Sequence, residues 1–162
     1  MGGMVPGGLH NRLMNYPDDI DVVWLACDRD GQVAAFVTGG CAPIPRAVLE
    51  TPGWDEAESS CIGLTELCDA QSLLRNGDPG SFLSIARRGL HVYDWQDVHR
   101  VRSDESHAYE LVAKPDAPCH FEDLPEPLAR LALTFRFDAS AFAQSPAIDP
   151  RTVAPCEQGR LC

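Results

Sequence analysis

The residues best suited to chemistry gather between His91 and His99, in the run HVYDWQDVH. On a strand, alternating residues would bring His91 and Tyr93 to one face, with Asp97 and His99 following, as a metal site requires. Two histidines eight residues apart match no standard ligand spacing, and a further ligand would have to come from elsewhere. The pattern therefore does not predict a metal site, although the residue types would permit one.

Two other interpretations of the same run remain open. In a structural role, Asp94 or Asp97 would cap a turn while Trp95 packs on a sheet. In a binding role, an exposed Trp95 beside Asp94 and Asp97 would form an interface anchor for a basic protein. We carry Asp94, Trp95 and Asp97 forward as candidate partner-binding residues.

A second candidate is the pair Cys119-His120, which combines a nucleophile with a base. Adjacent side chains of an extended segment point to opposite faces, so these two cannot form a catalytic dyad with each other. Elsewhere the chain has no Gly-x-Ser-x-Gly elbow, no phosphate-binding glycine loop and no His-Glu-x-x-His zinc motif. The sequence therefore predicts no catalytic residue and no cofactor.

Acidic residues cluster at Asp55, Glu56, Glu58 and Glu66. The first three fall at the start of a predicted helix, where carboxylates complement the helix dipole without any further role. The alternative is an electrostatic docking surface, and we count Asp55, Glu56 and Glu58 among the candidate contact residues.

The overall charge fits that alternative and equally well a role in solubility alone. The 162 residues include 24 acids and 13 bases, for a net charge of −11. This balance argues against a nucleic-acid partner, whose phosphates require basic groups, and against a basic membrane-binding face. A basic protein partner fits best, because opposite fields accelerate association.

The remaining composition indicates a cytoplasmic, single-domain protein. No targeting signal is recognisable at the start, and no window reaches 18 apolar residues. The seven cysteines form no Cys-x-x-Cys pair, so structural zinc is not predicted. A chain of this length folds as one domain without metal or disulfides.

The elements that would position these residues begin with a β-hairpin at 21–38. Gly31 supplies the positive φ of its tight turn. Further predicted elements are helices at 46–50, 54–69, 81–88 (capped by Ser81) and 124–130, and strands at 90–95, 108–113 and 131–137. We expect an α+β fold, a mostly antiparallel sheet with a few short helices in a single domain. Its predicted boundaries are a loosely ordered lead-in at 1–20, the domain at 21–142 and a tail at 143–162.

Three segments carry a resemblance to a known kind of protein. They are DVVWLACDRDGQVAAFVTGGCAPIP at 21–45, GLHVYDWQDVHR at 89–100 and AYELVAKP at 108–115. Together they resemble small bacterial immunity proteins of polymorphic or contact-delivered toxin systems. The resemblance implies a cytoplasmic protein that binds a cognate toxin tightly and blocks its active site, and it assigns no contact residue.

The sequence thus predicts a binding protein, an immunity-type inhibitor of a basic toxin, with no nucleic-acid or membrane partner. The alternative is a small metal- or cysteine-dependent enzyme using His91, His99, His120 or Cys119.

Overall fold

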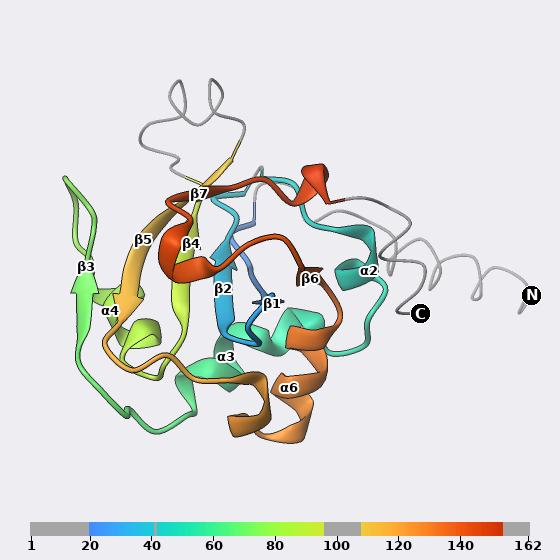
Figure 1. Cartoon of the computed structure of the whole chain (residues 1–162), viewed down its shortest axis with the longest axis horizontal. Coiled ribbons are helices and arrows are strands. Elements are labelled where there is room, and N and C mark those ends of the chain that lie inside the picture. The colour runs from blue at the N-terminus through green and yellow to red at the C-terminus, as the bar shows by residue number, and fades with distance from the viewer. Residues whose placement is uncertain (1–19, 41, 96–107, 154–162) are drawn as a thin grey trace, which may run out of the picture.

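The predicted hairpin forms the centre of the structure (Figure 1), a computed structural model described over residues 20–40, 42–95 and 108–153. Strands β1 (Val23–Asp28) and β2 (Val33–Val37) pair antiparallel, from Val23 opposite Val37 to Cys27 opposite Val33. Gly31 in the turn has a φ of 81°. A Cβ atom at Gly31 would also overlap the imidazole ring of His120. Glycine is therefore required there by both backbone conformation and space.

Around this hairpin lies a seven-stranded sheet in the order β3-β5-β4-β2-β1-β6, with β7 also paired to β5. The further strands are β3 (Ala70–Ser72), β4 (His91–Asp94), β5 (Tyr109–Pro115), β6 (Arg136–Phe137) and β7 (Ala147–Ile148). The β2–β4 and β1–β6 pairings are parallel, and the pairings β1–β2, β3–β5, β4–β5 and β5–β7 are antiparallel. The sheet is thus mixed but mostly antiparallel, and the predicted α+β fold class is confirmed.

Different elements cover the two faces of the sheet. Helices α3 (Ala57–Ile62), α4 (Gly80–Ala86) and α6 (Glu126–Leu133) pack on one face. On the other face lie α2 (Arg46–Leu49) and the C-terminal segment, which Figure 1 shows in red crossing in front of the sheet. Short 3₁₀ turns complete the chain at η1 (Trp54–Glu56), η2 (Phe121–Asp123), η3 (Phe142–Gln144) and η4 (Pro150–Thr152). Because both faces of the sheet are covered, every residue of β1 and β2 is buried.

An aromatic cluster fills the face of the sheet opposite helices α3, α4 and α6. The ring of Phe36 stacks on Trp24 at 4.4 Å and on Tyr93 at 5.1 Å between centroids. Ala26 and Ala34, on the same face, leave the room that these rings occupy. Alternating large and small side chains of adjacent strands thus produce one dense layer.

Two buried polar groups attach the C-terminal segment to this layer. The Asp28 carboxylate accepts hydrogen bonds from the backbone N–H of Asp30, Gln32 and Phe142 at 2.8–2.9 Å. The Tyr93 hydroxyl lies 3.1 Å from the carbonyl oxygen of Phe142 and 2.5 Å from that of Ser145. The chain from residue 143 to 153, expected to be a tail, therefore belongs to the domain.

Several local predictions were wrong. The helix expected at 54–69 ends at Ile62, directly before Gly63. Ser81 does not cap α4, which begins one residue earlier, after Pro79 and without a side-chain cap. The strand expected at 131–137 is helical over its first three residues, because α6 continues to Leu133 and buries Leu128, Leu131 and Ala132 at helical spacing. Only its last two residues form β6.

We predict that Asp28→Asn destabilises the protein by about 2 kcal/mol, the range for a buried hydrogen bond to a charged group. An amide keeps one acceptor oxygen, but its NH₂ group faces an N–H donor. Urea unfolding measures the change in the free energy of unfolding, with Asp30→Asn as control because that side chain is exposed. Equal stability of both variants would show that the Asp28 bonds contribute little.

Candidate functional site

The described part of the predicted 91–99 run, residues 91–95, belongs mostly to the core. Trp95 is only 5% exposed, and its ring meets Tyr109 edge-on at 5.5 Å. The backbone N–H of Trp95 donates to the carbonyl oxygen of Val37. The expectation that Trp95 is an exposed anchor is therefore wrong, and the structural interpretation holds for it. Asp94 is half-buried at the end of β4, while Asp97 and His99 lie outside the described residues.

His91 is buried on the aromatic face of β4. Its Nε2 lies 2.9 Å from Oε1 of Gln32, and its ring lies 5.8 Å from that of Phe142. Burial, with a smaller contribution from the Lys114 charge, lowers the pKa of His91 to about 4. The imidazole is therefore neutral at pH 7. Its Nδ1 has no hydrogen-bond partner among the described residues.

Cys119 and His120 serve separate structural purposes. Burial raises the pKa of the Cys119 thiol to about 11, so almost no thiolate exists at neutral pH. The Nδ1 atom of His120 accepts a hydrogen bond from the Glu122 N–H, while Asp123 accepts one from the His120 N–H. His120 is thus the cap of η2. Within the described ranges, no three His, Cys, Asp or Glu side chains are placed to hold one metal ion.

The three predicted contact acids of the 55–58 cluster are all exposed. Asp55 and Glu56 lie in η1 and Glu58 lies in the first turn of α3. None of them joins an ion pair with another described residue. Their charges consequently face solvent without a neutralising neighbour in the described part of the chain.

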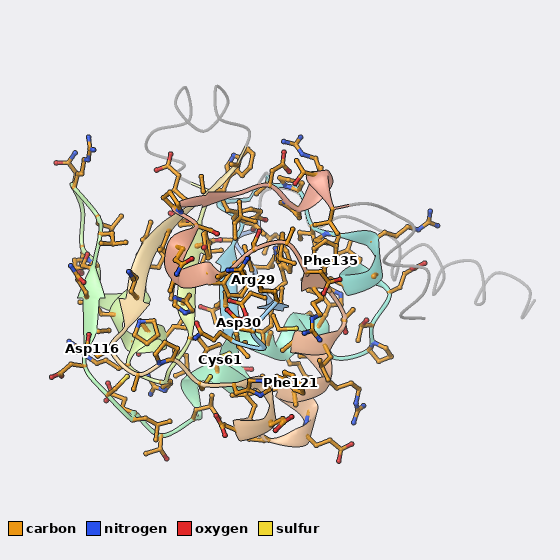
Figure 2. The ribbon with its side chains drawn as sticks, viewed as in Figure 1. Arg29, Asp30, Cys61, Asp116, Phe121 and Phe135 are labelled. Carbon is orange, nitrogen blue, oxygen red and sulfur yellow. The ribbon has the colours of Figure 1, made fainter. Side chains whose placement is uncertain are left out.

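An apolar residue that the sequence analysis did not single out lies beside these acids. Ile62 is 43% exposed and follows Glu58 by four positions, so the two share one side of α3. Ala57 and Cys61, the latter labelled in Figure 2, are the buried residues of the same helix. We call Asp55, Glu56, Glu58 and Ile62 the α3 surface. The helical spacing of α3 was the signal that could have identified Ile62. If Ala57 and Cys61, four residues apart, face the core, then Ile62 lies on the side of the exposed Glu58.

Two surface hollows flank the end of the described chain. One, of about 300 Å³, lies between the 137–140 and 147–153 segments. The other, of about 400 Å³, has an apolar lining that includes Ile44, Phe135 and Val153, with Arg46 and Arg151 also in it. Both arginines already pair with carboxylates, Arg46 with Glu50 at 3.5 Å and Arg151 with Asp149 at 2.9 Å. His91, Cys119 and His120 line neither hollow, so the reactive groups and these concave surfaces do not coincide.

Comparisons of this chain with protein-family models, with curated proteins and with solved structures found no match. In the ranges that the structure describes, no helix combines the length and the apolar character needed to cross a membrane.

We predict that His91 makes the protein less stable in mild acid. The unfolded chain takes up a proton below a pH of about 6.5, whereas the folded protein resists it down to about 4. Stability therefore falls as the pH drops through this window, by an amount on the order of 3 kcal/mol, and His91 adds no further loss below it. Urea unfolding of the wild type and of His91→Gln, at several pH values from 7 to 4, isolates this contribution. A difference between the two proteins that does not change with pH would contradict the prediction.

Proposed function

We propose that this protein binds a basic protein partner through the α3 surface and acts as an immunity-type inhibitor of a toxin. The observation that carries the proposal is the exposed, unneutralised set Asp55, Glu56 and Glu58 beside the exposed Ile62. A net charge of −11 extends the same negative field over the molecule. The toxin as the partner, and inhibition as the outcome, rest on the resemblance of the 21–45, 89–100 and 108–115 segments.

Two kinds of contact would divide the work of binding. Exposed carboxylates attract a basic partner during diffusion and so govern mainly the association rate. A desolvated apolar contact governs mainly how long the complex lasts. Since Trp95 is buried, Ile62 is the apolar contact that the α3 surface offers. A recess bordered by lysine or arginine on the partner would complement both.

The enzyme alternative has less support. A cysteine nucleophile requires a thiolate, and burial keeps Cys119 protonated. A histidine acting as base requires access to substrate, and His91 is only 1% exposed. Cys119 packs in the core beneath α3, α4 and α6, whereas His91 packs against Phe142 on the aromatic face, and His120 is held as the cap of η2. A binding role needs only the exposed groups, and the buried Cys119 and His91 then contribute to core packing.

The direct test of the proposed function is salt-graded affinity capture from a lysate of the source organism. We expect one basic protein at equal stoichiometry, released more readily as salt is raised, whose toxic activity falls when the complex forms. Binding that is insensitive to salt, or a captured protein whose activity is unchanged by the complex, would contradict the proposal.

We predict that Asp55→Lys and Glu58→Lys, combined, slow association with the captured partner at least tenfold at low salt. The change reverses two of the three charges that face the partner, and the loss should shrink at high salt because ions screen these fields. The control matched in charge combines Asp30→Lys and Glu122→Lys, two exposed reversals at the hairpin turn and in η2. Stopped-flow or surface-binding kinetics separates the rates. An equal effect of the control would assign the steering to net charge rather than to the α3 surface.

For Ile62→Ser we predict faster dissociation with a nearly unchanged association rate, since the variant removes an apolar contact and no charge. The side chain is exposed, so thermal unfolding should change little and serves as the check on folding. An unchanged dissociation rate would place the apolar contact elsewhere.

A further inference from the structure

Strand β3 is an edge strand in the part of the sheet that the structure describes. Its described pairing is with β5, and it stands at the end of the strand order. Figure 1 shows β3 at the left margin, with no described element on its outer side. An edge strand that nothing covers presents backbone donors and acceptors to a partner.

The register decides which backbone groups point outward. Ala70 lies opposite Pro115, which has no N–H to donate, so these two residues are not a hydrogen-bonded pair. On either side, the Asp116 N–H donates to the carbonyl oxygen of Asp69, and the Leu73 N–H donates to that of Val112. Bonded and non-bonded pairs alternate in an antiparallel ladder. The N–H and C=O groups of Ala70 and Ser72 therefore point away from β5.

Several exposed side chains around this edge are apolar or acidic. Leu67 is 66% exposed and Leu73 is 40% exposed. The 64–79 segment and its β5 flank expose four acids, Glu66, Asp69, Asp78 and Asp116, against two bases, the exposed Arg75 and the half-buried Lys114 opposite Gln71. Figure 2 shows Asp116 beside the start of β3, where its N–H bonds to Asp69. An added strand with alternating basic and apolar side chains complements this edge, whereas a second copy of the chain would bring like charges together.

We propose that β3 accepts an extended segment of the basic partner as an additional strand of the sheet. The proposal rests on the proposed function, from which it takes the basic partner, and adds the way in which that partner is held. Backbone hydrogen bonds to Ala70 and Ser72 would supply affinity, and the charge and alternation of side chains would supply selectivity.

The test uses the full chain and a defined probe, the peptide acetyl-Lys-Val-Lys-Val-Lys-Val-Lys-amide. On ¹⁵N-labelled protein we expect the largest amide shifts, and slowed hydrogen exchange, at Ala70 and Ser72. Ala70→Pro removes the outward N–H and leaves the inward bonds of Asp69 and Leu73, so the peptide should bind at least tenfold more weakly. Ala70→Val is the matched control, because it changes the side chain and keeps the N–H. The same peptide with Glu in place of Lys should not bind.

Shifts centred away from residues 69–73, or equal affinity of the Ala70→Pro and Ala70→Val proteins, would overturn the proposal. Should Ala70→Pro fail to fold, the shift and exchange map of the wild type decides the question without it. The two proposals fail separately. If charge reversal at Asp55 and Glu58 leaves the association rate of the partner unchanged, the proposed role of the α3 surface is wrong. The peptide experiment tests the β3 edge independently of that result.

Discussion

The buried carboxylate of Asp28 is the constraint on which much of this structure depends. One oxygen organises the tight hairpin turn through the N–H groups of Asp30 and Gln32, and the other holds Phe142 of a segment more than a hundred residues later. A carboxylate without exposed surface is costly unless its lone pairs are satisfied, so the turn and the crossing segment must form together. The Tyr93 hydroxyl, close to the carbonyl oxygens of Phe142 and Ser145, fastens the same segment from a neighbouring strand.

The consequence is that the central strands β1 and β2 are buried on both sides. Helices α3, α4 and α6 cover one face, and the crossing segment with α2 covers the aromatic face. This arrangement takes His91, Trp95 and Cys119 out of contact with solvent, and burial then suppresses the charged forms of the histidine and the thiol. His91 and Cys119, the described residues that could act as base or nucleophile, therefore contribute to core packing.

Among the described residues, the exposed features include charged side chains, a few apolar side chains and the edge strand β3. Asp55, Glu56 and Glu58 adjoin Ile62 on α3, and the chain then runs through Leu67 into β3. The two proposed contact regions are therefore consecutive in the sequence. The negative charge would attract a basic partner from a distance, and backbone hydrogen bonds to β3 would hold it after contact. The two effects complement each other in recognition.

Sequence reasoning was most successful where a local pattern has a single physical solution. The hairpin at 21–38 followed from two β-rich runs around Gly31, and the strands containing His91 and Tyr109 followed from alternation. It was least successful where two periods fit the same residues. Leu131, Leu133, Phe135 and Phe137 alternate like a strand, yet Leu128, Leu131 and Ala132 also repeat like a helix. Residues 131–133 form the end of α6, because its apolar side packs against the sheet.

The sequence by itself determined the acidity of the protein, the α+β class and the exposure of the acids at 55, 56 and 58. These depend on composition and on short-range patterns. Only the tertiary structure decided that Trp95 is core, that residues 143–153 belong to the domain and that β3 is an edge strand of the described sheet. Each of these depends on which distant segment occupies a given face or flank of the sheet, and side-chain spacing along the chain carries no record of that choice.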